Sequence, residues 1–244
     1  GYRRQTANYR EYVETWVHEA KTPLVAAHLM LENLDDALAD GVQSQEAREK
    51  VDALAEEVDR VEGYIEQALF YARSESLDRD YVVRNASLQS IVSSALRRNA
   101  RTMISAHVAP ICRGLELEVF ADEKWVEFIL GQLIQNSVKY AREEGAQLLF
   151  SASRVNVGRA DDCVKLVVRD NGCGVPAADL DRVFDRGFTG ENGRSGKRST
   201  GIGLYLVRRL CDKMGLGIVA RSERGEFFEV EITFPTNRMH YFES

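Results

Sequence analysis

The amino-acid sequence predicts an α+β protein in which a helical hairpin, forming a dimeric four-helix bundle, is followed by a two-layer α/β sandwich. Residues 1–74 contain two helices with heptad patterns, as the helices of such bundles do. Residues 75–80 are polar and indicate a hinge between two domains. From residue 81 to 240, strand-like and helical segments alternate, which is typical of helices packed on one face of a sheet.

Composition and charge narrow the class of protein. Of the 244 residues, 44% are hydrophobic and 29% are charged, as is usual for a globular chain. The formal net charge of -6 gives no strong basic field, so nucleic acid is not an expected partner. The 4 cysteines form no CxxC pair, which argues against a zinc site or a disulfide framework and favours a reducing cytoplasm. No run of about 18 apolar residues occurs, so no membrane span is expected.

The first predicted helix, over residues 6–40, has apolar or small residues seven apart in two rows. One row is Val17, Leu24, Leu31 and Leu38, and the other is Ala20, Ala27 and Leu34. This a/d pattern is typical of a helix that packs along a seam with other helices. Gly41 is suited to end this helix, and Ser44 is a suitable N-cap for the next one.

The second helix repeats the pattern, so the two helices should form an antiparallel hairpin. Its rows are Val51, Val58, Ile65 and Ala72, and Leu54, Val61 and Ala68. One hairpin cannot enclose a core, whereas two copies form a four-helix bundle, and we therefore predict a homodimer. The alternative is a hairpin that packs against the rest of its own chain.

The remainder of the chain should contain short strands and three helices. Strands are expected at 81–83, within 108–120, and at 147–153, 163–169, 218–222 and 227–234. Helices are expected from a Ser87 cap to about Arg101, from an Asp122 cap through Tyr140, and from about Gly203 to Met214. The segment 185–200 is rich in Gly, Arg, Asn and Ser, has no apolar period and should be a loop.

His18 is the first residue whose chemistry suggests a function. It follows the seam residue Val17 and so falls at a b position, beside the seam and facing solvent. Pro23, inside the helical pattern, should bend the helix because it removes a backbone hydrogen bond. Glu19 could bind one nitrogen of a neutral imidazole and leave the other free to act as a nucleophile. Taken alone, the local sequence is explained more simply by an ordinary surface histidine.

Two glycine-containing motifs could belong to a nucleotide site. Asp170 ends an apolar strand and precedes Gly172 and Gly174. A carboxylate there can accept a hydrogen bond from a nucleobase amino group, and glycines let the backbone approach a ligand. A tight turn between a strand and a helix is the alternative. Gly201 and Gly203 open a predicted helix whose N–H groups favour phosphate, although an isolated GxG is a weak signal.

A third motif lies within the helix that Asp122 should cap. Gln132, Asn136 and Lys139 share one face of this helix because of their spacing. An amide oxygen can ligate Mg²⁺, and an ammonium group can pair with phosphate. The alternative is a solvated polar face of a helix.

Taken together and in this order, the motifs resemble the H, N, G1, F and G2 boxes of sensor histidine kinases. They are His18-Glu19-x-x-Thr22-Pro23, Asn136-Ser137-x-Lys139-Tyr140, Asp170-x-Gly172-x-Gly174, Phe184 with Phe188, and Thr200-Gly201-x-Gly203-Leu204. The resemblance spans almost the whole chain and implies that residues 81–240 have the GHKL (Bergerat) ATP-binding fold. Residues 124–132 are similar to the bacitracin-sensing, intramembrane-sensing branch of the family.

The resemblance implies a role for each residue that matches the first box. His18 would be the phospho-acceptor, and Glu19 would orient or deprotonate it. Thr22 stands at the position that helps to place water in phosphatase activity. Residues 1–74 would accordingly be the dimerisation and histidine phosphotransfer hairpin.

The resemblance also implies the residues of an ATP site. Asp170 would recognise adenine, Gly172 and Gly174 would shape its pocket, and residues 185–200 would form a lid over ATP. The other implied contacts to the nucleotide and its phosphates are Asn136, Lys139, Tyr140, Phe188, Arg194, Lys197, Arg198, Thr200, Gly201, Gly203 and Leu204. Asn136 would be the ligand of Mg²⁺. Gln132 stands where the family usually has Asn, and its extra methylene argues against direct metal ligation by this residue.

The implied activity is phosphorylation of His18 by Mg-ATP, followed by phosphoryl transfer to an aspartate of a response regulator receiver domain. We expect the chain to be the cytoplasmic portion of a bacterial cell-membrane protein, with transmembrane sensor segments upstream. Two alternatives remain open. One is an ATPase of the same nucleotide-binding fold, as in chaperones or topoisomerases, and the other is a dimeric scaffold that binds a regulator without catalysis.

Overall fold

A computed structural model of the chain describes residues 24–25, 27–31, 34, 45–74, 81–190 and 201–236. The chain divides into two compact units, Gly1–Asp80 and Tyr81–Ser244. His18, Glu19 and Thr22 lie outside the described residues, as do the expected hinge at 75–80 and most of the expected lid.

The described part of the N-terminal unit is helical. Helix α2 (Gln45–Ser74) has 30 residues, and residues 27–31 also lie in a helix. Leu31 packs with Val51 and Ala55 in a small apolar core. His28 Nε2 lies 2.9 Å from Asp59 Oδ1, which adds a polar link between the two helical segments. Leu31 and Val51, one from each predicted heptad row, therefore lie in the same small core, whereas Leu34, Leu54 and Val61 of the other rows are exposed.

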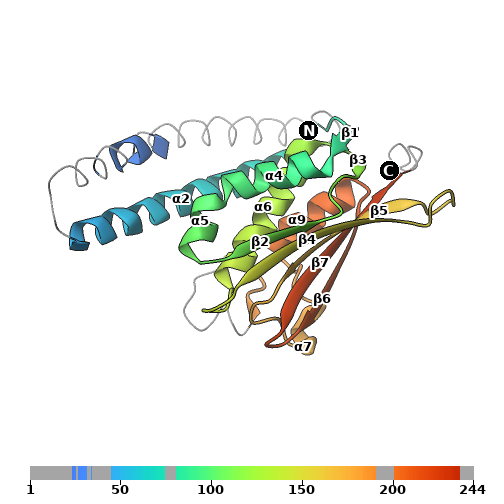
Figure 1. The fold of residues 1–244 in the computed structure, drawn as a ribbon. Coiled ribbons are helices and arrows are strands. Elements are labelled where there is room, and N and C mark those ends of the chain that lie inside the picture. The colour runs from blue at the N-terminus through green and yellow to red at the C-terminus, as the bar shows by residue number, and fades with distance from the viewer. Residues whose placement is uncertain are drawn as a thin grey trace, which may run out of the picture. The chain divides into compact units, whose positions relative to one another are not determined.

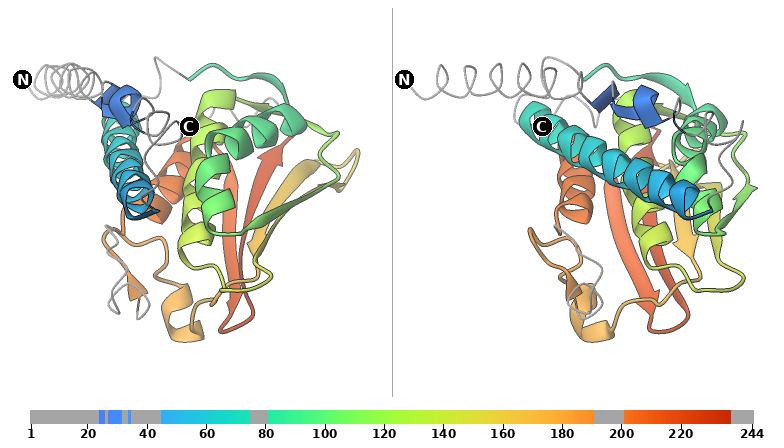
Figure 2. Two further views of the ribbon diagram at one scale, coloured as in Figure 1. Left: turned by 60° about the vertical axis from the view of Figure 1, so that its left-hand side comes forward. Right: turned by 90° about the vertical axis from the view of Figure 1, so that its left-hand side faces the viewer.

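The second unit consists of two layers, a mixed sheet and a layer of helices on one of its faces (Figures 1 and 2). The strand order is β2-β4-β5-β7-β6, and only the β2–β4 pair is parallel. The strands are β2 (Ala109–Arg113), β4 (Gln147–Val155), β5 (Cys163–Asp170), β7 (Phe227–Pro235) and β6 (Gly217–Glu223). The main helices are α4 (Leu88–Arg98), α6 (Glu123–Lys139) and α9 (Gly203–Lys213). The α+β class is therefore confirmed.

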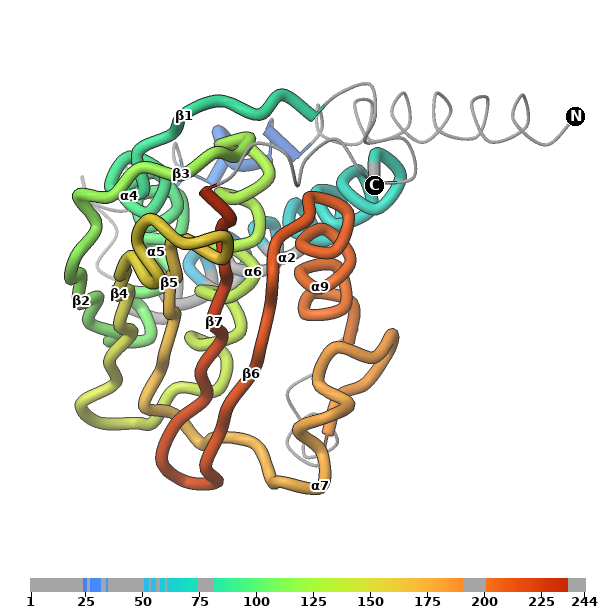
Figure 3. Tube along the Cα trace, turned by 90° about the vertical axis from the view of Figure 1, so that its right-hand side faces the viewer, coloured from blue at the N-terminus to red at the C-terminus, as the bar shows by residue number. Residues whose placement is uncertain are grey.

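Smaller elements complete this unit. A separate two-stranded antiparallel sheet pairs β1 (Arg84–Ser87) with β3 (Glu118–Ala121). The short helix α5 (Ala100–Ser105) follows α4, and α7 (Ala177–Leu180) lies between β5 and α9 in the chain. The tube in Figure 3 follows this course through the unit.

The core lies between the sheet and the helices because the strands alternate apolar and polar residues. Side chains at even positions of β4, β5 and β7 point inward, and Phe150, Leu166 and Ile232 are fully buried. Leu130 of α6 and Leu206 of α9 are fully buried in the helical layer. Burial of apolar surface between the two layers is the main force that holds them together.

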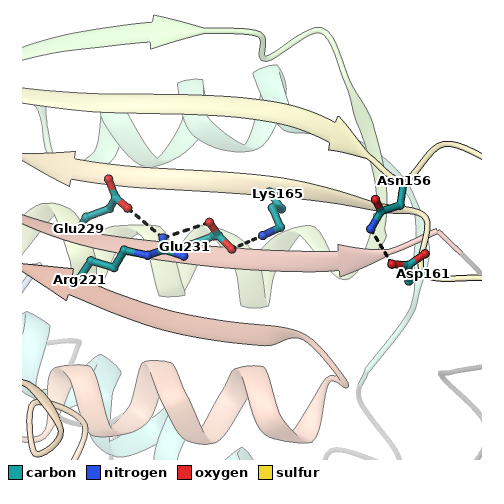
Figure 4. Close-up of polar contacts among 6 residues, drawn as sticks. All are labelled: Asn156, Asp161, Lys165, Arg221, Glu229 and Glu231. Atoms are coloured by element: carbon teal, nitrogen blue, oxygen red, sulfur yellow. Dashed lines mark hydrogen bonds and ion pairs between the residues drawn. The ribbon is translucent and has the colours of Figure 1, made fainter.

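The opposite face of the sheet is polar and carries a row of ion pairs (Figure 4). Lys165 Nζ lies 2.6 Å from Glu231, and Arg221 Nη1 lies 3.1 Å from Glu229 and 3.2 Å from Glu231. Burial tends to raise the pKa of Glu231, but the hydrogen bonds from Lys165 and Arg221 outweigh that effect and lower it. This face therefore stabilises the pairing of β5, β7 and β6 through cross-strand charges.

Two expected helix caps are confirmed. Ser87 Oγ accepts a hydrogen bond from Ser90 N at 3.3 Å, and Asp122 Oδ1 accepts one from Lys124 N at 3.1 Å. Each cap satisfies a backbone N–H that has no partner within its own helix. The second cap sets the position of α6, which carries the N-box residues.

Two other expectations about this unit are wrong. Residues 81–83 are not a strand, because the strand begins at Arg84 and Val82 N donates instead to Asp122 Oδ2 at 2.9 Å. The helix after Ser87 does not continue to Arg101. It is interrupted at Asn99, whose side-chain Nδ2 donates to Ala95 O at 2.8 Å. Such local bonding by Asn competes with the regular pattern of a helix.

Candidate nucleotide-binding site

Asp170 lies at the end of β5 on the inward face of the sheet, and only 5% of it is exposed. Its Oδ2 accepts a hydrogen bond from Ser137 Oγ at 2.9 Å, and its Oδ1 accepts one from Gly172 N at 3.0 Å. Burial raises the pKa of this carboxyl group, while the hydrogen bonds and the positive charge of Arg142 act in the opposite direction. A carboxylate that is buried among uncharged donors keeps acceptor capacity for a ligand.

The glycines after Asp170 stand where no side chain fits. A Cβ atom on Gly172 would lie 2.4 Å from Tyr140 O, and one on Gly174 would lie 2.1 Å from Glu223 O. Gly174 also has a φ of 60°, in the left-handed region that favours glycine. The strand-to-helix turn is therefore packed against both α6 and β6, as a rigid wall of a site would be.

Hydrogen bonds hold this loop on both sides. Cys173 N donates to Tyr140 O at 3.2 Å, and Cys173 O accepts from Gly225 N at 2.8 Å. The Asn171 side chain accepts from Gln147 N at 2.8 Å and donates to Gly145 O at 2.9 Å. The loop is thus anchored to the end of α6, the β6–β7 turn and the start of β4.

Three polar residues of helix α6, Gln132, Asn136 and Lys139, are buried or half-buried. Gln132 is 6% exposed, and Asn136 and Lys139 are half-buried. Lys139, the last residue of α6, places Nζ 5.3 Å from the centre of the Tyr140 ring. Half-buried amide and ammonium groups of this kind suit contacts to a charged ligand.

The segments that contain the F-box residue Phe188 and the G2-box residue Gly201 pass close to each other. Gly187 N donates to Gly201 O at 3.0 Å, and a Cβ on Gly201 would lie 2.5 Å from Gly187 C. Phe188 follows, with the Arg182 guanidinium 4.7 Å from its ring centre. Helix α9 begins at Gly203, packs against α6, and exposes its N-terminal N–H groups at this close approach.

The structure thus brings Asp170, Gly172 and Gly174 together with Tyr140 and the end of α6. Leu204 is half-buried in the first turn of α9. The predicted phosphate contacts Arg194, Lys197, Arg198 and Thr200 lie outside the described residues. Within the ranges described, no three His, Cys, Asp or Glu side chains gather into a ready-made metal cage.

Sequence reasoning missed Ser137 as a partner of Asp170. A signal for it existed, because Ser137 lies one turn after Leu133 and two turns after Leu130 on the buried side of α6. A hydroxyl in an apolar row must find a partner, and that partner is Asp170.

Family comparisons agree with this geometry. Residues 9–77 match the family described as His Kinase A (phospho-acceptor) domain. Residues 121–238 match the family described as Histidine kinase-, DNA gyrase B-, and HSP90-like ATPase. The chain belongs to the histidine kinase family. Its nucleotide-site motifs therefore lie within an ATPase domain, and His18 lies within a phospho-acceptor domain.

Similar curated proteins are sensor kinases of bacteria. The histidine kinase chain is 32% identical over 228 residues to the sensor histidine kinase YxdK of Bacillus subtilis, covering 92% of this chain and 64% of that one. It is 29% identical to the sensor protein BceS of Halalkalibacterium halodurans, covering 90% of this chain and 60% of that one. The chain therefore spans about three fifths of these relatives. BceS belongs to the bacitracin-sensing, intramembrane-sensing branch, which is the branch that residues 124–132 resemble.

Solved structures support the fold. The full-length structure of ShkA in complex with AMPPNP has a TM-score of 0.64 and 23% identity, covering 92% of this kinase chain and 45% of ShkA. The Acinetobacter baumannii histidine kinase AdeS has a TM-score of 0.55 and 18% identity, covering 91% and 98% of the two chains. No helix in the described parts of the kinase chain is both long and apolar enough to cross a membrane.

Proposed function

We propose that this chain is the catalytic portion of a sensor histidine kinase that phosphorylates His18 with ATP. The phosphoryl group would then pass to an aspartate of a response regulator receiver domain. One observation carries the proposal. His18 lies within the region that matches a phospho-acceptor domain. The same chain buries Asp170, which accepts hydrogen bonds from uncharged donors, and next to it Gly172 and Gly174 stand where a Cβ atom would clash with the backbone.

Asp170 would recognise the adenine of ATP. Its carboxylate accepts hydrogen bonds from Ser137, Gly172 and the backbone of Phe228, and it keeps further acceptor capacity that suits the amino group of adenine. Gly172 and Gly174 would form the wall against the base. Gly201 and Gly203, at the start of α9, would present N–H groups to the phosphates, with Phe188, Thr200, Leu204 and the basic residues Arg194, Lys197 and Arg198 around them.

The donor set of α6 fits a divalent cation that arrives with the triphosphate. The amide oxygen of Asn136 is a suitable Mg²⁺ ligand, and a site with one protein ligand leaves the remaining positions to phosphate and water. Mg²⁺ bound there would neutralise negative charge on the phosphates. Lys139 and Tyr140 would bind the phosphates and the nucleotide at the end of the same helix.

The N-terminal unit would supply the phosphate acceptor. Residues 1–74 would act as the dimerisation and phosphotransfer hairpin, 75–80 as a hinge, and 81–240 as the ATP-binding domain. His18 would attack the γ-phosphorus, Glu19 would orient or deprotonate its imidazole, and Thr22 would place water in a phosphatase reaction. Catalysis would rest mainly on positioning and electrostatics.

Exposed apolar residues on the hairpin support a homodimer. Leu54 of α2 is 54% exposed, and Leu34 and Val61 are also exposed, although all three belong to the predicted seam. Burying such a row against a second copy would complete a four-helix bundle. The homologues are membrane-associated sensor kinases, which supports a cell-membrane protein in which this portion would be cytoplasmic.

Incubation with γ-labelled ATP tests the proposal directly. We expect a label on the protein that is lost in acid and stable in alkali, as a phosphohistidine is. His18→Gln should abolish this label while ATP affinity stays within about twofold, because His18 is not part of the ATP site. Release of phosphate without labelled protein would identify the chain as an ATPase. If neither labelled protein nor free phosphate formed, the scaffold without catalysis would be the better interpretation.

A further inference from the structure

Ser137 is a buried hydroxyl to which the proposed reaction assigns no role. It lies on the sheet-facing side of α6, is 4% exposed, and donates to Asp170 Oδ2 at 2.9 Å across 33 residues of sequence. Its neighbours along this side of the helix, Leu133 and Ile134, are fully or almost fully buried and apolar. An alanine would suit such a row equally well, so packing alone does not explain the hydroxyl.

We propose that Ser137 is a positioning residue that acts through Asp170 to make the site select a 6-amino purine over a 6-keto purine. This inference rests on the proposed function, since it takes Asp170 to be the group that meets the base. It adds a residue that sets nucleobase selectivity without contacting the phosphates.

The position of the proton in the Ser137–Asp170 hydrogen bond decides what this pair can offer to a ligand. An ionised carboxylate can only accept, so the hydrogen between Ser137 and Asp170 belongs to the serine hydroxyl. Gly172 N likewise donates to the other carboxylate oxygen. Every atom that this Ser137–Asp170 pair can still offer to a ligand is therefore an acceptor. A 6-amino group matches these acceptors, whereas a 6-keto oxygen meets them with like partial charge.

Without the hydroxyl, this arrangement would weaken in two ways. Oδ2 would lose its side-chain donor, so the carboxylate would be freer to rotate about its bond to the backbone. A buried carboxylate with fewer donors also takes up a proton more readily, and a protonated Asp170 can donate to a keto oxygen. Arg142 is the one charged residue whose field acts on Asp170 in the described part of the chain, and it does so without a hydrogen bond to the carboxylate. Both changes reduce selectivity.

The test compares Mg-ATP with Mg-ITP by equilibrium binding to the whole chain; the two purines differ in the group at position 6 and in N1, which carries a hydrogen only in ITP. Mg-tripolyphosphate serves as a probe without a base. For Ser137→Ala we expect the ratio of the ITP and ATP dissociation constants to fall roughly tenfold, the size of one hydrogen bond to a charged group. Tripolyphosphate affinity should not change. Ser137→Thr retains a hydroxyl and should restore most of the ratio.

A matched control removes a hydroxyl at the far end of the sheet. Thr236 Oγ1 donates to Asp162 O at 2.8 Å, so Thr236→Val loses one hydrogen bond without touching the site, and its ratio should equal that of the wild type. Ser137→Cys keeps the side-chain volume with a weaker donor and should give an intermediate ratio. It also provides the measurement if the alanine variant does not fold.

The role of Ser137 and adenine recognition by Asp170 would fail through different results. A folded Ser137→Ala or Ser137→Cys variant with the wild-type ratio would overturn the role of Ser137 and leave the proposed function intact. Wild-type protein that binds ATP no better than ITP or tripolyphosphate would overturn adenine recognition by Asp170, and this inference with it.

Discussion

Two aspartates near opposite ends of β5 show how one strand holds a structural acid and a candidate functional acid. Asp162 immediately precedes the strand and Asp170 ends it, and both are buried, with 9% and 5% exposure. Asp162 accepts hydrogen bonds from Arg154 Nε at 3.0 Å and Arg154 Nη2 at 2.7 Å. That partner lowers the pKa of Asp162 to about 2, whereas burial raises the pKa of Asp170.

The two pKa values shift in opposite directions because the carboxylates have different hydrogen-bond donors. Asp162 is neutralised by the Arg154 guanidinium of β4, and it also accepts a hydrogen bond from Gly158 N in the β4–β5 turn at 3.0 Å. Asp170 has only uncharged hydrogen-bond donors and lies between α6 and the glycine loop. A carboxylate left without a bonded counter-ion costs stability, and such a cost is characteristic of sites that await a ligand.

The substitution Asp170→Asn should have the largest effect on ATP binding. We expect ATP affinity to fall by about 100-fold or more, because an acceptor for the base is replaced by an amide that also donates. The ATP-free variant should be no less stable than the wild type, since a neutral amide avoids the cost of burying a charge. Binding titrations and thermal unfolding, run on the same samples, would measure both effects.

The pH dependence of Asp170 has a definite sign. Its folded pKa is above the unfolded value of 3.8, so the folded chain binds more protons between the two values. The wild type should therefore lose stability relative to Asp170→Asn as the pH rises from about 3.8 through the raised pKa. A stability difference that stays flat over this range would contradict the assignment.

The substitution Asp162→Asn should lower stability and leave ATP affinity almost unchanged, which is the reverse of Asp170→Asn. Unfolding should become easier near neutral pH, because Arg154 loses its charged partner, while ATP affinity stays within about twofold. The pKa of Asp162 is lowered to about 2, so its contribution is complete above the unfolded value of 3.8 and disappears as the pH falls towards 2. Denaturant unfolding at several pH values would measure it. Weakened ATP binding at unchanged stability would argue against a purely structural role.

Lys165→Gln should have the smallest effect on stability, and it tests whether the polar face of the sheet influences the nucleotide site. The Lys165–Glu231 pair on the polar face is part-exposed, and such pairs contribute roughly 0 to 1 kcal/mol. We expect a change in unfolding free energy within that range, and unaltered ATP binding and labelling of His18. A clear loss of nucleotide affinity would show that this face communicates with the site.

Residue types and their local spacing were enough to predict the features that depend on short stretches of chain. The caps at Ser87 and Asp122, the alternation along β4, β5 and β7, and the glycine motif after Asp170 follow from residue type and spacing over a few positions. Ordered motifs were enough to identify the family, because each box is short and contiguous.

The tertiary structure alone decided which distant groups meet. It set the strand order with β2 parallel to β4, moved the first strand to Arg84, and ended α4 at Asn99. It also paired Asp170 with Ser137 and Asp162 with Arg154, which gave two similar carboxylates opposite pKa shifts. Periodicity tells which side of an element is buried, but the partner across the core depends on register and packing that involve the whole domain.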